Sequence, residues 1–291
     1  MWSSGSITAK SWNSASMPGP ANDVVCRGRK AAPNANRRTT MTATEQTLRQ
    51  QLAACYRLIA HFRMSDLIFT HISLRLPGPE HHFLINPYGL LFDEITASSL
   101  VKIDLQGRPV APSEYPVNPA GFVIHSAIHA AREDAQCVLH THTRAGCAVA
   151  ALECGLLPVN QMSMEFHGKV AYHAYEGIAL DLDEQQRLVA DLGDKPVMIL
   201  RNHGLLTTGR SVAEAFLRMY YLEKACDIQL AAQSAGQLVL PSEAVCAHTE
   251  RQFNEPMRGL KPGELSDPDA LQLAWAALLR MLERVAPGYR D

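Results

Sequence analysis

The sequence predicts an α/β protein, a three-layer α/β/α sandwich with a mixed, largely antiparallel central sheet. Three observations predict it. Strand-like and helix-like segments alternate along the chain without a strict strand-helix-strand repeat. Short strands joined by tight turns dominate the first half, which favours antiparallel pairing. Hydrophobic residues make up 47% of the 291 residues, enough to bury a large core.

Composition and periodicity divide the chain into three parts. Residues 1–43 are rich in Ser, Ala, Asn and Pro and lack the apolar run of a signal peptide. We expect either a disordered leader there or sequence upstream of a natural start at Met41 rather than at Met1. Residues 44–234 have the regular periodicity of a folded domain, and the proline-interrupted residues 235–291 predict a helical extension.

The first half of the domain predicts one helix and several short strands. Apolar residues recur every three or four positions over residues 48–62, which is typical of an amphipathic helix. Residues 70–76 alternate between apolar and polar, a Pro-Gly-Pro turn follows, and residues 83–85 return as the second strand of a hairpin. We expect one more strand at residues 101–105.

The second half interleaves helices with strands. Ser211 is placed to cap the longest helix, because its side chain can accept a hydrogen bond from the first helical turn. We expect helices at residues 120–132, 144–153, 183–192, 212–233 and 269–285, and strands at residues 136–143, 169–173 and 197–201.

Charge and hydropathy argue against nucleic acid and membrane as partners, and cysteine usage indicates a cellular location. The 27 Lys and Arg nearly balance the 29 Asp and Glu, so no net charge draws the chain to nucleic acid or to an anionic membrane. No segment approaches the roughly 18–20 apolar residues of a membrane span. The seven cysteines are scattered, which is typical of reduced thiols in a cytoplasmic protein. No glycine-rich nucleotide-binding motif is present.

Three histidines are the candidate functional residues. His140 and His142 end an apolar strand, and side chains two apart in a strand point the same way. Both imidazoles therefore aim at one spot, and neutral imidazole is a good ligand for zinc and similar metals. His203 follows another apolar strand and precedes Gly204, which permits a tight turn beside a ligand. The residues alone leave two interpretations open, a metal site or hydrogen-bonded histidines at strand ends.

Two motifs resemble the class II aldolase/adducin family. They are Val138-Leu139-His140-Thr141-His142 and, about sixty residues later, Leu200-Arg201-Asn202-His203-Gly204-Leu205. The resemblance covers residues 48–233 and is closer to the adducin head than to the sugar-phosphate aldolases. It implies a divalent metal, most readily zinc, held by His140, His142 and His203. It also implies a homo-oligomer, commonly a tetramer, and lyase or epimerase chemistry through an enediolate.

The departures from this family narrow the substrate. The family's aldolases carry a glutamate nineteen residues before the first strand histidine, as metal ligand or general base, where this chain has Gly121. The serine pair that holds substrate phosphate is here Pro119-Ala120, and the phosphate-binding asparagine aligns with His71. We therefore expect the substrate to be a small non-phosphorylated hydroxy-carbonyl compound.

Other residues are candidates for supporting roles. Glu165 is the candidate replacement for the missing base, and the alternative is a solvent-exposed carboxylate on a loop. His125 and His129 lie four apart on one helical face. They either orient the strand histidines or make ordinary local hydrogen bonds.

The alternative function is a non-catalytic, adducin-like module for oligomerisation or binding. The resemblance implies that actin and spectrin binding by adducin relies on a long neck and a basic tail. This chain ends in Gly288-Tyr289-Arg290-Asp291, with no lysine-rich tail. We therefore do not expect actin to be a partner.

Overall fold

The computed structural model describes residues 43–177, 183–254 and 270–291. All of them belong to one unit, Thr40–Asp291. The predicted leader lies outside the described residues except for Ala43, where the first helix begins. Within the described residues, no helix combines the length and the apolar character that a bilayer span requires.

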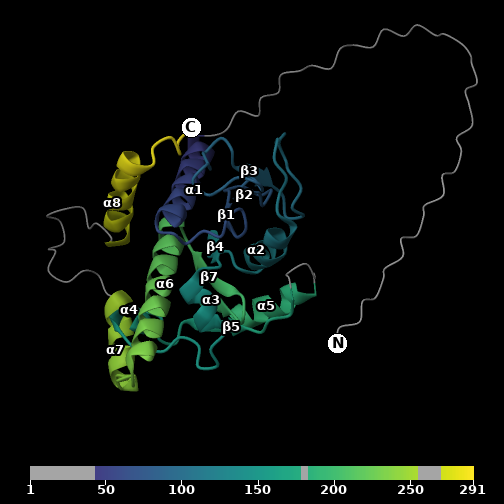
Figure 1. Ribbon diagram of the computed structural model, residues 1–291. Helices are drawn as coiled ribbons and strands as arrows, with labels where there is room; N and C mark the ends of the chain where they lie inside the picture. Colours follow the sequence, from purple (N-terminus) through teal and green to yellow (C-terminus); the bar gives the residue numbers. More distant parts are fainter. Residues whose placement is uncertain (1–42, 178–182, 255–269) are drawn as a thin grey trace, which may run out of the picture. The chain divides into compact units, whose positions relative to one another are not determined.

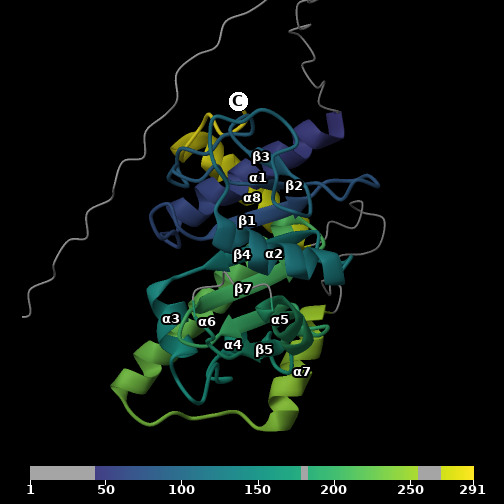
Figure 2. The ribbon, with the colours of Figure 1, turned by 90° about the vertical axis from the view of Figure 1, so that its right-hand side faces the viewer.

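Within the described residues, seven strands form one mixed sheet in the order β3-β2-β1-β4-β7-β6-β5 (Figures 1 and 2). Neighbouring strands run antiparallel except for the parallel pair β5 and β6. The predicted mixed, largely antiparallel sheet is therefore confirmed. The strands are β1 (His71–Arg75), β2 (Phe83–Ile85), β3 (Val101–Ile103), β4 (Cys137–Thr141), β5 (Val170–His173), β6 (Val197–Leu200) and β7 (Gly204–Gly209).

Helices cover both faces of this sheet, which confirms the predicted sandwich. Helices α2 and α5 pack together on one face, and α1, α3 and α6 lie on the other (Figure 1). Helix α8 packs against α1 and α6, and α4 and α7 pack together beside α6. The helices are α1 (Ala43–His61), α2 (Pro119–Ala131), α3 (Arg144–Ala150), α4 (Gln161–Met164), α5 (Glu184–Leu192), α6 (Val212–Ala235), α7 (Glu243–Asn254) and α8 (Ala270–Val285).

Strand alternation decides which side chains face which helices. In β4, Leu139 joins the core beneath α1 and α6, whereas Val138 joins the core beneath α2 and α5. In β1, Ile72 and Leu74 join the first of these cores. His140 and His71, which are paired across β4 and β1, therefore lie on the α2 face.

Three elements were missed by the sequence analysis: β7, α7 and the four-residue helix α4. β7 begins at Gly204, after a turn in which Asn202 adopts a φ of 55°, and it pairs with both β4 and β6. The glycines at its ends made it look like a loop, although all six of its residues are buried. Helix α7 begins just after Ser242, whose carbonyl accepts a hydrogen bond from the Cys246 amide.

Tyr56 ties α1 to the sheet. Its side chain is fully buried, and its hydroxyl accepts hydrogen bonds from the amides of Ile72 (2.8 Å) and Asn86 (3.1 Å). The hydroxyl proton is donated to the Ile72 carbonyl at 2.5 Å. One side chain thus satisfies backbone groups at the start of β1 and at the end of β2.

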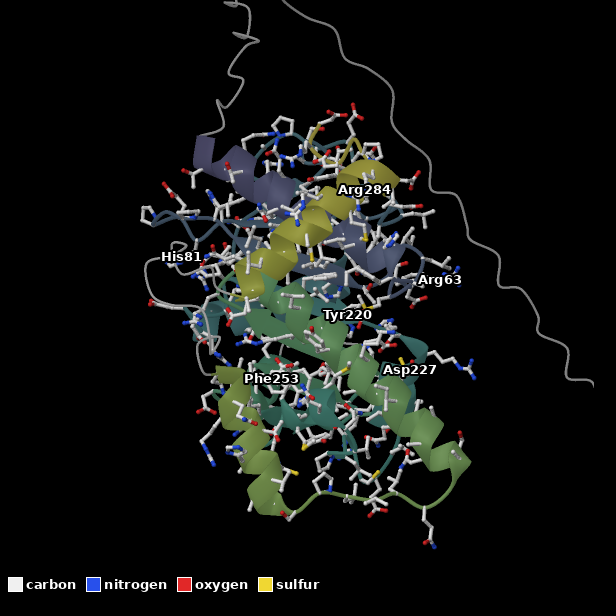
Figure 3. All side chains as sticks on the ribbon, turned by 90° about the vertical axis from the view of Figure 1, so that its left-hand side faces the viewer. Arg63, His81, Tyr220, Asp227, Phe253 and Arg284 are labelled. Atoms are coloured by element: carbon white, nitrogen blue, oxygen red, sulfur yellow. The ribbon has the colours of Figure 1, made fainter. Side chains whose placement is uncertain are left out.

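Helix α8 lies against α1 and α6 (Figure 3), and aromatic rings form part of this contact. The Trp275 ring of α8 lies 5.8 Å from that of Phe216 in α6. Its indole nitrogen donates to the side-chain oxygen of Gln51 in α1. Helix α8 is therefore part of the core beneath α1 and α6.

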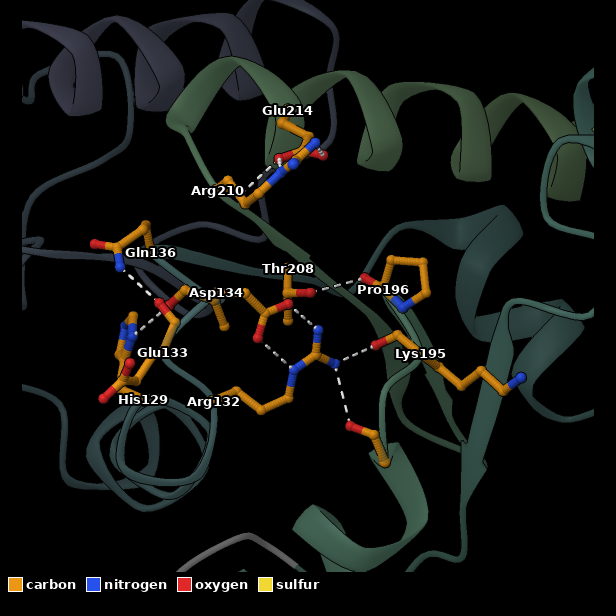
Figure 4. Close-up of polar contacts among 12 residues, drawn as sticks. His129, Arg132, Glu133, Asp134, Gln136, Lys195, Pro196, Thr208, Arg210 and Glu214 are labelled. Atoms are coloured by element: carbon orange, nitrogen blue, oxygen red, sulfur yellow. Dashed lines mark hydrogen bonds and ion pairs between the residues drawn. The ribbon is translucent and has the colours of Figure 1, made fainter. Parts of the chain in front are cut away.

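Arg132 fastens the end of α2 to the loop before β6 (Figure 4). Its guanidinium donates to the carbonyls of Lys195 (2.6 Å) and Gly193 (3.2 Å) and to the Asp134 carboxylate (3.0 Å). These contacts hold α2 against the face of the sheet on which the candidate site lies.

Candidate metal centre

Three imidazoles meet at one end of the sheet. His140 lies in β4, His142 directly follows it, and His203 lies in the turn between β6 and β7. The Nε2 atom of His142 is 2.9 Å from Nε2 of His140 and 2.8 Å from Nε2 of His203. One ligand atom from each ring lies within 4.8 Å of the other two. The structure thus brings together all three histidines that the sequence singled out.

Gly204 makes this convergence possible. A Cβ atom at this position would lie 2.4 Å from the carbonyl oxygen of Thr141, a backbone atom that cannot move away freely. It would also lie 3.2 Å from the His142 ring and 3.4 Å from the His140 ring. Any larger residue would therefore separate β4 from β7 and push the imidazoles apart.

Hydrogen bonds to the Nδ1 atoms of His140 and His142 fix the orientation of their Nε2 atoms, which face the cluster. Nδ1 of His140 lies 2.9 Å from the Leu205 carbonyl, and Nδ1 of His142 lies 3.0 Å from the Asp66 carboxylate. Both oxygens can only accept, so in the neutral rings the proton is on Nδ1. Each Nε2 then carries a lone pair that points into the cluster.

This arrangement of donors fits a divalent metal ion. Two lone pairs that face each other at 2.9 Å repel, and a cation between them turns the repulsion into ligation. Zinc with nitrogen ligands at about 2.0–2.1 Å in a tetrahedral arrangement separates them by roughly 3.3 Å. That separation falls within the range that the three rings span, so a small adjustment of the side chains accommodates the ion.

Burial favours the neutral form of the His140 and His203 rings, which is the form that binds metals. Burial is the main cause that lowers the pKa of His140 well below its usual value, and His203, His71 and His142 add to it. The pKa of His203 is lowered to about 4 by burial and by the neighbouring His142. Neutral imidazoles have free lone pairs at ordinary pH, so a metal need not displace protons to bind.

Asp66 is a site residue that the sequence analysis missed. It lies in the loop between α1 and β1, and that loop includes Leu67 at a φ of 49° and Thr70 at a φ of 65°. Positive φ angles at residues other than glycine are strained and persist where the surrounding structure imposes them. No spacing in the sequence links Asp66 to His142, which lies 76 positions away.

Glu165 is not brought to the three histidines within one chain. It follows α4, and the charged groups that act on its carboxylate are Lys169, before β5, and Arg218, which donates to the carbonyl of Thr208 near the end of β7. His203 follows the end of β6 and precedes the start of β7, whereas Lys169 precedes the start of β5, which runs parallel to β6, and Thr208 lies near the end of β7. Burial raises the pKa of Glu165, so it is also not the exposed loop carboxylate of the alternative interpretation.

His125 and His129 do not hydrogen-bond the strand histidines. Nδ1 of His125 and Nε2 of His129 lie 2.6 and 2.7 Å from the hydroxyl oxygen of Ser73 in β1. Nδ1 of His129 also lies 2.9 Å from the carbonyl of Ala135. These hydrogen bonds join α2 to β1 and to the loop before β4, and neither residue orients a strand histidine by a direct hydrogen bond.

Residues 50–230 match the family described as the Class II Aldolase and Adducin N-terminal domain. The chain belongs to the class II aldolase and adducin family. The family predicted from the two histidine motifs is thereby confirmed.

Solved structures and curated relatives come from both branches of the family. An aldolase II superfamily protein from Pseudomonas syringae is 56% identical, with a TM-score of 0.79 over 88% of this chain and 99% of that one. An L-fuculose 1-phosphate aldolase from Glaciozyma antarctica PI12 is 30% identical, with a TM-score of 0.71 over 84% of this chain and 94% of that one. Alpha-adducin from Rattus norvegicus is 46% identical over 84% of this chain, which corresponds to 34% of adducin.

Proposed function

We propose that the protein is a divalent-metal-dependent, aldolase-type lyase or epimerase acting on a small, non-phosphorylated hydroxy-carbonyl compound. His140, His142 and His203 would hold the metal, and zinc is the ion that suits three imidazoles best. The observation that carries the proposal is the pair of inward-facing Nε2 lone pairs on His140 and His142 at 2.9 Å.

The ligand set determines what the ion contributes. A bound divalent ion supplies Lewis-acid polarisation of a carbonyl and stabilises the negative charge that develops on its oxygen. Three neutral imidazoles leave its double charge undiminished. In this chain, Asp66 and the Leu205 carbonyl hold two of the rings in the orientation and tautomer that ligation requires.

Three sequence positions that differ from the family's aldolases support a substrate without phosphate. The L-fuculose 1-phosphate aldolase is named for a phosphorylated sugar. Pro119-Ala120 in this chain offers no hydroxyl group to a phosphate, and Gly121 offers no carboxylate. A compact hydroxy-carbonyl compound that chelates the metal needs neither.

Carbon-bound proton exchange tests this function directly. The zinc-loaded protein is incubated in D₂O with hydroxyacetone or dihydroxyacetone, and loss of the proton signal beside the carbonyl is followed by NMR. We expect exchange with the wild-type protein and none with His140→Ala. A zinc-loaded wild-type protein that catalyses neither exchange nor carbon–carbon cleavage over a panel of such compounds contradicts the proposal.

A second candidate is a non-catalytic, adducin-like module, favoured by the 46% identity to alpha-adducin. Such a module would assemble without metal, and it would catalyse no proton exchange in the experiment above. For either function we propose a homo-oligomer, a tetramer, measured by light scattering. The free cysteines within the described residues support a cytoplasmic location.

A further inference from the structure

Buried polar atoms without hydrogen-bond partners gather beside the three histidines. They are both ring nitrogens of His71, Nε2 of His125 and the hydroxyl oxygen of Thr70. His71 is only 4% exposed, and a buried polar atom left unpaired costs about 1–3 kcal/mol. Such a concentration in a well-packed layer is typical of a place where a ligand group completes the bonding.

The chain of hydrogen bonds beneath α2 determines which nitrogen of His125 carries the proton. Nδ1 of His129 donates to the Ala135 carbonyl, so its Nε2 accepts the proton of Ser73. The Ser73 oxygen in turn accepts from Nδ1 of His125. Nε2 of His125 is therefore a bare acceptor, and its ring lies 4.3 Å from that of His71.

The His71 ring packs directly against Gly121, which has no side chain. His71 is paired with His140 across β1 and β4, and their rings are 5.5 Å apart. A Cβ atom on Gly121 would lie 2.8–3.0 Å from three atoms of the His71 ring. The imidazole thus occupies the space into which any side chain at position 121 would point.

The ring of His71 has hydrogen-bonding capacity that the described residues leave unused. The neutral ring carries one N–H donor and one bare acceptor, and neither makes a hydrogen bond of regular geometry. A hydroxyl group, which both donates and accepts, is the natural partner.

We propose that His71, whose ring fills the space beside Gly121, contacts the ligand held at the three histidines and binds one of its hydroxyl groups. This inference rests on the proposed function and names the side chain that replaces a carboxylate there. His71 is not among the residues whose ligand atoms converge, so its contact is with the organic ligand and not with the ion.

The test separates ligand binding from metal binding. The protein is loaded with Co²⁺, whose visible spectrum reports its ligands, and titrated with acetohydroxamate, a small chelating probe with a hydroxyl oxygen. We expect His71→Leu to bind Co²⁺ within about threefold of the wild type and acetohydroxamate at least tenfold more weakly, because one hydrogen bond to a charged ligand is lost. Its urea midpoint should be equal or higher, since unpaired buried atoms are removed.

His129→Leu is the matched control. It removes a histidine buried under the same helix, but one whose two nitrogens are both bonded. We expect lower stability and unchanged acetohydroxamate affinity. Gly121→Ala should weaken acetohydroxamate binding like His71→Leu, because its methyl group displaces the His71 ring.

The outcomes distinguish the two proposals. Unchanged acetohydroxamate affinity in His71→Leu overturns this inference alone, as does a parallel loss of Co²⁺ binding, which would make His71 a metal ligand. A wild-type protein that binds no Co²⁺ overturns the proposed function together with this inference.

Discussion

Removing the Asp66 carboxylate should weaken metal binding without unfolding the protein. In Asp66→Ala, Nδ1 of His142 loses its acceptor at 3.0 Å, so the ring is free to rotate and to move its proton to Nε2. Loss of such a carboxylate partner typically costs ten- to a hundredfold in metal affinity. Asp66 is 40% exposed and His142 is 26% exposed, so water replaces part of the interaction.

We therefore expect the lower end of that range, about tenfold, which corresponds to about 1.4 kcal/mol. Asp66→Asn retains an oxygen that accepts from Nδ1 and should lose only about threefold, because it lacks the charge. Competition with a chromophoric zinc chelator measures both affinities. Unfolding in urea checks that neither substitution alters the fold.

Asp227→Ala is the matched control, since Asp227 is an exposed carboxylate on α6 (Figure 3). It should bind zinc like the wild type. Zinc affinity in Asp66→Ala within twofold of the wild type would refute the reasoning that the outer nitrogen of His142 needs its carboxylate.

Three further predictions concern the fold that carries the site. Gly204→Ala should lower the free energy of unfolding in urea by about 1–3 kcal/mol, because its methyl group meets the Thr141 carbonyl; an unchanged urea midpoint would contradict this. Tyr56→Phe leaves two buried amides unpaired and should cost about 2–4 kcal/mol, measured in the same way, and a cost below 0.5 kcal/mol would show that the hydroxyl is dispensable. For pH, His71 and His129 have pKa values of about 3 in the fold against 6.5 ordinarily, so the unfolded chain binds more protons between these values. The urea midpoint of the metal-free protein should therefore fall from pH 7 to pH 5, and equal midpoints would contradict the neutral, buried state of these rings.

Local periodicity predicted the fold class, most of the helices and strands, and the convergence of two histidines. Residues two apart in a strand share a face, so the aim of His140 and His142 follows from their spacing alone. The third histidine was found through its glycine neighbour and the family resemblance. β7 was missed because glycines at both ends concealed a buried strand between them.

Contacts between segments far apart in the chain could not be predicted from the sequence. Asp66 meets His142 only because a strained loop and β4 are neighbours in the fold. Position 121 looked like the loss of a functional group, whereas the structure shows that its missing side chain makes room for His71. Glu165 was chosen from the family resemblance, and within one chain it lies near the start of β5, whereas His203 follows the end of the parallel strand β6.

The metal content of the purified protein is the most direct test of the central claim. The protein is expressed with ample zinc, dialysed free of loosely bound ions and analysed by elemental mass spectrometry, with His140→Ala treated in parallel. We predict about one zinc per wild-type chain and almost none in His140→Ala. A wild-type protein without stoichiometric metal, or a variant that retains it, would contradict a metal centre built from these three histidines.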